Sequence, residues 1–154
     1  MKKAKRMLAS SITAVLMVGI LSAGVASAWN EEQLQQLKTT KSCIKCKLEG
    51  ADLSGANLDH ANLVGTYLCN ANLSAAILTT ANMAYVDLSG ANLTGANLSG
   101  ANLAHAYLNG TNLSNANLTS VILREASMSG VNLSNATWTD GSKCKEGSYG
   151  QCNQ

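Results

Sequence analysis

The sequence predicts an all-β solenoid, because its apolar residues recur at a period that fits neither an α-helix nor a straight strand. From Leu48 to Trp138 a large apolar residue stands at every fifth position, giving 19 uninterrupted blocks of five. A step of five turns a helix by a net angle of about 140°, and on a strand it alternates faces. Only a chain that turns once in each block keeps these side chains on one side. The absence of Pro and Phe also predicts a narrow core.

Residues 1–28 have the pattern of a secretory signal peptide. A basic start (Lys2, Lys3, Lys5 and Arg6) precedes an apolar stretch over residues 7–25 and the small-residue site Ala26-Ser27-Ala28. The alternative is an uncleaved anchor, since about 20 mostly apolar residues can just span a bilayer. We expect cleavage after Ala28, a periplasmic or extracellular location, and no membrane contact afterwards.

Cleavage also reverses the balance of charge. It leaves seven basic against nine acidic residues, a formal net charge of −2, so the basic balance of the whole chain does not predict nucleic-acid binding.

Residues 29–46 are expected to form an N-terminal cap that contains a short helix. A stacked solenoid exposes its apolar core at both ends, so each end needs a cover. Asn30 is the candidate N-cap, with Gln33 as its capping-box partner and Trp29 packed against Leu34. Leu34 and Leu37 would face the first repeat. The alternative for this segment is a disordered leader.

Residues 46–140 are predicted to form the solenoid. Sixteen of the 19 block centres are Leu, and the residue two places before each centre is small, in thirteen cases Ala. These two columns point inward, and the core column includes Leu53, Leu58, Leu63, Leu93, Leu98 and Leu103. The remaining positions are mostly Asn, Asp, Ser, Thr and Gly, which suit solvent and turns. Each unit then stacks on its neighbours and buries one long core.

The blocks, as in ANLTG ANLSG ANLAH at residues 91–105, resemble the A-(D/N)-L-x-x motif of the pentapeptide-repeat family. The resemblance covers about 95 of the 126 residues that follow the signal peptide. It implies a right-handed quadrilateral β-helix with four blocks in each coil. The five-residue period alone does not fix that number.

Residues 141–154 are predicted to form a C-terminal tail closed by a disulfide. Trp138 replaces Leu at the last centre, where its larger area can cover the open coil, and Thr139-Asp140-Gly141 indicates a turn. The polar tail has little apolar surface to hold it down. Export to an oxidising compartment favours a bridge between Cys144 and Cys152.

Three further cysteines leave alternatives open. Cys43 and Cys46 form a C-x-x-C, for which a local structural disulfide is favoured over a redox pair, half a zinc site, other pairings or free thiols. No second C-x-x-C accompanies it, and Lys47 stands where a haem-attachment motif needs His. Cys69 falls in an outward column, as a free thiol or a site of intermolecular linkage.

The sequence offers no convergent catalytic set, cofactor motif or metal site. His60 and His105 are nine blocks apart, which with four blocks in a coil places them on different faces. A rod filled by Leu and Ala also has no interior cleft for a substrate. We therefore expect a protein that is not an enzyme, with no catalytic, cofactor-binding or metal-binding residues.

Function is expected on the surface columns. The least polar face carries Val64, Ala84, Tyr85, Ala104, His105 and Ile122, and this set is the predicted interaction patch. Scattered apolar surface is also normal in proteins without partners. A second candidate is the row of Ser and Thr at positions 54, 74, 94, 114 and 134, beside a column of Asn, which suits either a regular polar lattice or plain solvation.

The favoured hypothesis is an exported scaffold or interaction protein with an unidentified protein partner and an undetermined oligomeric state. The family resemblance implies a rival, since some pentapeptide-repeat proteins imitate DNA and bind DNA gyrase. Such a mimic needs a densely acidic surface, whereas residues 51–140 contain only Asp52, Asp59, Asp87, Glu125 and Asp140. Export would also separate the chain from gyrase. Assembly or surface binding at the cell envelope is the third possibility.

Overall fold

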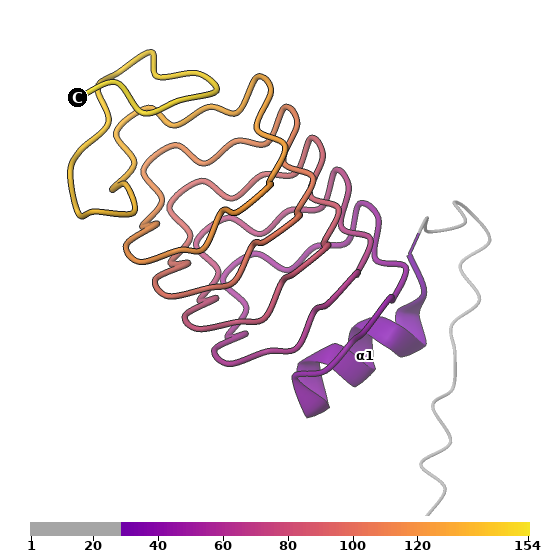
Figure 1. Cartoon of the computed structure of the whole chain (residues 1–154). Coiled ribbons are helices and arrows are strands. Elements are labelled where there is room, and N and C mark those ends of the chain that lie inside the picture. The colour runs from indigo at the N-terminus through magenta and orange to yellow at the C-terminus, as the bar shows by residue number, and fades with distance from the viewer. Residues whose placement is uncertain (1–28) are drawn as a thin grey trace, which may run out of the picture.

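The computed structural model describes residues 29–154, and the predicted signal peptide lies outside these described residues. One helix, α1 (Glu31–Thr40), precedes a chain that winds as a square coil to the C-terminal tail. Figure 1 shows the coils stacked in register from the indigo N-terminal end to the yellow C-terminal end. Within the described part, no helix has the length and apolarity needed to cross a membrane.

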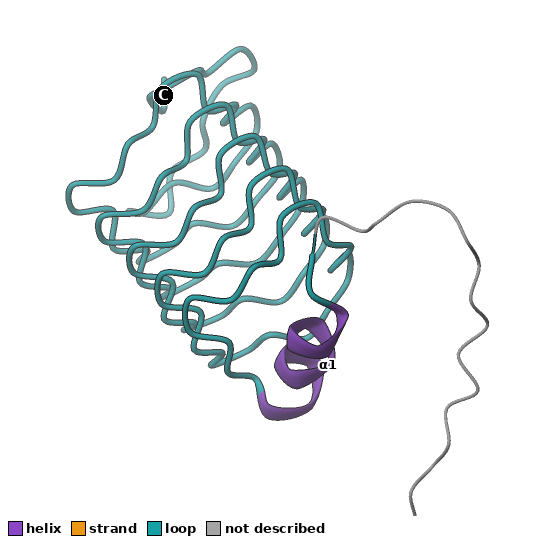
Figure 2. Cartoon of the chain, turned by 90° about the vertical axis from the view of Figure 1, so that its right-hand side faces the viewer, coloured by secondary structure: helices purple, strands orange, loops and turns teal. Residues whose placement is uncertain are grey.

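Each side of the coil pairs with the same side of the next coil, four blocks further along the chain. Asn62 forms a parallel bridge with Asn82, Asn82 with Asn102, and Asn102 with Ile122. Four blocks of five residues therefore make one coil of the solenoid. The bridges are isolated single residues and residues 29–154 contain no regular strand, as Figure 2 shows by its unbroken loop colouring outside α1. A corner in every block leaves no room for a longer strand.

The corners are tight turns with a left-handed residue. At a representative corner the N–H of Ala101 donates to the carbonyl of Leu98 at 2.8 Å, and Gly100 between them has φ +71°. The same fifth place has positive φ in every block from Lys45 to Asn135, although fewer than half of these places hold Gly. The turn therefore imposes the left-handed conformation on many residues that ordinarily avoid it.

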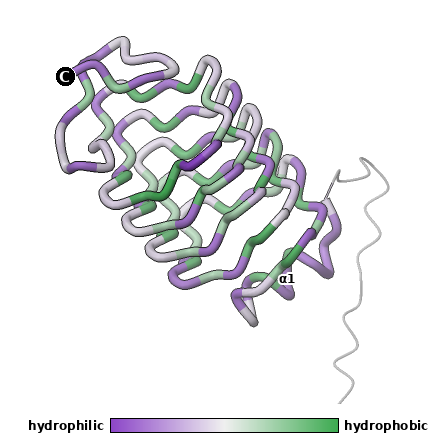
Figure 3. Tube along the Cα trace, in the orientation of Figure 1, coloured by the Kyte–Doolittle hydropathy of each residue, from purple (hydrophilic) through white to green (hydrophobic). Residues whose placement is uncertain are grey.

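The core is a narrow column of leucines lined by small residues. All six leucines of the predicted core column are at most 1% exposed. Hydrophobic positions recur coil after coil along the rod in Figure 3. Thr66 and Thr111 stand where most blocks have Ala, and both are fully buried. Their hydroxyls donate to backbone carbonyls of the preceding coil, Thr66 to Cys43 and Thr111 to Leu88, the latter at 2.7 Å, so neither buried hydroxyl is unsatisfied.

Helix α1 lies across the first coil. Asn30 precedes it, and its side chain accepts a hydrogen bond from the Gln33 N–H at 3.1 Å. Leu34 and Leu37 are buried and belong to the core. The predicted reciprocal bond from the Gln33 side chain to the Asn30 N–H is wrong. The Asn30 N–H donates to the carbonyl of Lys47 at 3.1 Å, and Gln33 Oε1 accepts from the Lys47 N–H at 2.7 Å, because both groups reach the unpaired edge of the coil.

The C-terminal tail folds back over the last coil (Figure 1). Tyr149 forms an antiparallel bridge with Asn132, and Lys143 forms one with Thr137. The tail is linked by a disulfide between Cys144 and Cys152. Trp138 is half-buried against the core. Two of the four sides of the last coil are thus covered by the chain itself.

Candidate interaction groove

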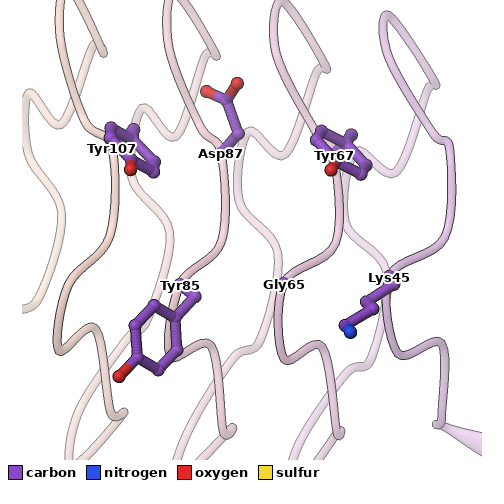
Figure 4. Close-up of a pocket in the computed structure, with 6 residues that line it drawn as sticks. All are labelled: Lys45, Gly65, Tyr67, Tyr85, Asp87 and Tyr107. Atoms are coloured by element: carbon purple, nitrogen blue, oxygen red, sulfur yellow. The ribbon is translucent and has the colours of Figure 1, made fainter.

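Two neighbouring columns of side chains bound a groove along one long edge of the rod. It is lined by Lys45, Gly65, Tyr67, Tyr85, Asp87 and Tyr107, has a volume of about 350 Å³, and is called the tyrosine groove below. One column consists of left-handed corner residues, here called the corner column, and supplies Lys45, Gly65 and Tyr85 at intervals of one coil. The adjacent side supplies Tyr67, Asp87 and Tyr107 at the same spacing (Figure 4). The coil therefore gathers residues that are far apart in the sequence into one surface.

The three tyrosines are exposed because their positions in the repeat point outward. Tyr67 and Tyr107 occupy the bridge position before the central Leu, and Tyr85 occupies the left-handed corner, with φ +59°. Their exposed fractions are 46%, 55% and 57%. In Figure 4, Tyr67 and Tyr107 lie on either side of Asp87, and Tyr85 lies across from them. The groove thus has aromatic walls on three sides.

Gly65 provides the open floor of the groove. It stands between Lys45 and Tyr85 in the corner column, and a Cβ at this position would come within 3.3 Å of the Lys45 side chain at Cγ. The aliphatic stem of Lys45 therefore leans toward Gly65. A larger residue here would fill the space between the two columns.

Beyond Tyr85 the corner column continues as a stacked pair. The rings of Tyr85 and His105 are parallel within 3°, with centroids 4.7 Å apart. His105 Nδ1 lies 3.1 Å from a carboxylate oxygen of Glu125 in the next coil. These contacts hold Tyr85 from one side and fix that wall of the groove.

Asp87 supplies the negative charge of the groove. Its carboxylate points away from Tyr85, and Oδ1 accepts a hydrogen bond from the Ser89 N–H at 3.0 Å. In the described part of the chain no Lys, Arg or His nitrogen lies within 4 Å of this half-buried carboxylate. Next to it, burial raises the pKa of the Cys69 thiol, and the charges of Asp87 and Glu49 raise it further. Cys69 is thus a poorly ionised free thiol beside the groove.

Comparison with protein families identifies the repeat. Residues 42–74, 61–100 and 96–135 match the model of pentapeptide repeats, in eight copies. The chain belongs to the pentapeptide repeat family. Among curated protein sequences, none matches it significantly.

Several solved structures are similar to this pentapeptide repeat chain. One is a pentapeptide repeat protein of the Arabidopsis thaliana thylakoid lumen, with 26% identity over 68% of this chain and 82% of the other, and a TM-score of 0.50. Another is Rfr23 of the cyanobacterium Cyanothece 51142, with 33% identity over 70% and 98% and a TM-score of 0.35. A trypsin-treated variant of QnrB1, a plasmid-mediated fluoroquinolone resistance protein, has 24% identity over 64% and 65% and a TM-score of 0.42. Family membership supports the right-handed β-helix.

The predicted interaction patch is only partly exposed in this pentapeptide repeat rod. Val64 and Ala84 are half-buried, and Ala104 is only 7% exposed, so its prediction as an outward residue is wrong. The Ala104 N–H donates to Asn102 Oδ1 at 3.1 Å, but Val64 and Ala84 make the same bond to the Asn two residues before them, at 3.4 Å, so this bond does not explain the difference. Three other residues of the predicted patch are accounted for as follows. Tyr85 lines the groove and the His105 ring stacks on the Tyr85 ring, whereas Ile122 is exposed on the last coil.

Sequence reasoning missed Tyr67, Asp87 and Tyr107. Their signal is present, since each follows the last by four blocks, the length of one coil. The predicted patch followed the column of Val64, Ala84 and Ala104, which stands three positions before the missed column in the chain, and did not extend to the next side.

The Ser and Thr row of this pentapeptide repeat chain is engaged with its own Asn column. Amides stack between coils, with Asn92 donating to Asn72 at 3.3 Å and Asn132 to Asn112 at 3.2 Å. The hydroxyls of Thr94 and Ser134 each donate at 2.7 Å to the Asn two residues before them. These hydroxyls are thus less available to a flat polar lattice.

The other candidate residues are dispersed. Cys43 and Cys46 are joined by a disulfide, Cys69 is free, and His60 and His105 occupy different columns. Within residues 29–154 no three His, Cys, Asp or Glu side chains converge as metal ligands.

Proposed function

We propose that this chain is an exported, non-enzymatic scaffold that binds a protein partner through the tyrosine groove. The observation that carries the proposal is the gathering, on one edge of a rod, of three exposed tyrosines and a carboxylate that forms no ion pair with residues 29–154. Tyrosine is enriched at the centres of protein interfaces because its ring gives a large contact area and its hydroxyl a hydrogen bond. Membership of the pentapeptide repeat family supports an interaction module rather than an enzyme.

The two ends of the rod are proposed to be caps that keep binding on the side. Leu34 and Leu37 of α1 cover the first coil, and the tail covers two sides of the last. Both ends carry a disulfide, Cys43–Cys46 and Cys144–Cys152, as an oxidising compartment favours. Capped ends disfavour edge-to-edge association.

Export is a separate part of the proposal and has its own test. The basic start, apolar stretch and Ala26-Ser27-Ala28 site predict that the native protein begins at Trp29. Intact-mass measurement on protein from the source cells should find that species, with both disulfides formed, outside the cytoplasm. A full-length cytosolic species with reduced cysteines would refute export.

The gyrase-binding alternative has less support. The carboxylates of the coil are few and lie in different columns, so they do not form a row: Glu49, Asp52, Asp59, Asp87, Glu125 and Asp140. A continuous acidic stripe is what a DNA mimic needs.

Photo-crosslinking in the source cells tests the proposed function. A benzophenone amino acid replaces Tyr85 in one variant and Ile77 in the control. Ile77 is 41% exposed and lies on the side opposite Tyr67. A discrete protein adduct is expected from position 85 and not from position 77. No adduct at 85, or the same adducts from both positions, would contradict the proposal.

A further inference from the structure

We propose that the tyrosine groove binds an arginine side chain of the partner protein, with the guanidinium held between Tyr67 and Tyr107 and paired with Asp87. This inference rests on the proposed function, because it names the chemistry that the same groove recognises.

The spacing of the walls suits a cation. Tyr67 and Tyr107 are two coils apart, which at about 4.8 Å per coil is roughly 10 Å. A cation midway between the two rings lies about 5 Å from each, inside the ~6 Å range of a cation–π contact. Tyr85 closes a third side, and the Asp87 side chain turns away from it, so the coil between the two rings leaves the space open (Figure 4).

The negative charge of Asp87 gives the groove a preference for cations. Oδ1 accepts only the Ser89 N–H, and Oδ2 accepts no hydrogen bond from residues 29–154. A guanidinium that enters between the rings can donate to this oxygen in place of water. Arginine fits better than lysine, because its planar guanidinium stacks on aromatic faces and donates to a carboxylate at the same time.

Lys45 sets the polarity of the groove. It lies in the same groove two coils before Asp87, roughly 10 Å away along the rod. Its charge repels a guanidinium near Lys45 and favours the place beside Asp87, two coils further along the groove. A ligand that was an anion would instead depend on Lys45, so this residue distinguishes the two charges.

The test is an NMR titration of the purified protein with N-acetyl-arginine amide, with the neutral N-acetyl-citrulline amide as the matched probe. We expect saturable shifts of the Tyr67, Tyr85 and Tyr107 ring signals with the arginine probe alone. Asp87→Asn should weaken binding about tenfold, the loss of one charge-assisted contact. Lys45→Gln should strengthen it.

Asp52→Asn is the control for charge. Asp52 is exposed on another side, and its Oδ1 accepts from Ser54 N–H and Asn72 Nδ2, both at 3.1 Å, bonds that Asn can keep. It should leave binding unchanged. Equal binding of the citrulline probe, an unchanged affinity of Asp87→Asn, loss of binding in Lys45→Gln, or the absence of shifts would overturn the arginine inference. In that case, a protein adduct from the photo-crosslinking experiment at position 85 would still support the proposed function.

Discussion

Single residues in the corners carry a conformational cost that varies around the coil. Gly95 and Ala75 occupy the same corner one coil apart, with φ +68° and +56°. The repeat requires the same left-handed turn from both, although only Gly adopts it freely. The turn therefore explains why Gly recurs at the fifth place and why it is not obligatory there.

The exchange of Gly and Ala at these two positions tests that explanation. Gly95→Ala should destabilise the protein by about 1 kcal/mol, because the new Cβ meets no atom within 4 Å and only the backbone conformation is penalised. Ala75→Gly should stabilise it by a similar amount. Denaturant unfolding measures both. If the two changes have the same sign, the corners do not impose this conformation.

The reactivity of Cys69 reports the electrostatics of the groove. Because burial and then the charges of Asp87 and Glu49 raise the pKa of its thiol, less thiolate exists at neutral pH. Alkylation by iodoacetamide should be slower than that of free cysteine. Asp87→Asn should accelerate it, whereas Asp52→Asn should not. An Asp87→Asn rate equal to that of the wild type would show that this carboxylate does not influence the thiol.

At the scale of elements, the ends of the rod were predicted in outline and differ in detail. The N-cap role of Asn30 and the inward direction of Leu34 and Leu37 follow from local patterns. The Gln33 contact to Lys47 does not, because it depends on where the first coil leaves an unpaired N–H. The hydrogen bond of the Thr111 hydroxyl does not follow from a local pattern either. Its acceptor, the carbonyl of Leu88, belongs to the preceding coil and is brought close by the stacking.

The C-terminal tail gives a prediction at this scale. Cys144→Ser with Cys152→Ser removes a bridge worth about 2 to 3 kcal/mol to the closure of a short loop. The loosened tail should expose Trp138 and the edge of the last coil. We expect an unchanged β signal in circular dichroism and end-to-end oligomers in light scattering. A double variant that stays as monomeric as the wild type would contradict the capping role.

At the scale of the whole molecule, the period of five predicted the solenoid and its leucine column. The number of blocks in a coil came from the family resemblance, because the period contains no information on it. Prediction of the groove required the number of blocks in a coil, since Tyr67, Asp87 and Tyr107 are neighbours only when four blocks make one coil. The burial of Ala104 could not be predicted from the repeat, because Val64 and Ala84 occupy the same place in their coils and stay half-buried.

The inward and outward columns should differ sharply in stability. Leu98 is fully buried, so Leu98→Ala should leave a cavity and cost about 2 to 5 kcal/mol. Ser99 is half-buried at the wall, and Ser99→Ala should cost little. Denaturant melts compare the two. Equal losses would mean that the columns are misassigned.

The core maintains the fold and the tyrosine groove is proposed to maintain binding, so folding and binding should be separable by mutation. The most direct measurement is the yield of the position-85 crosslink in a Tyr67→Ser/Tyr107→Ser variant whose unfolding curve matches the wild type. Both rings are about half exposed, so their loss should leave stability nearly unchanged. We expect the adduct to disappear. An adduct formed in full by this folded variant would contradict this expectation.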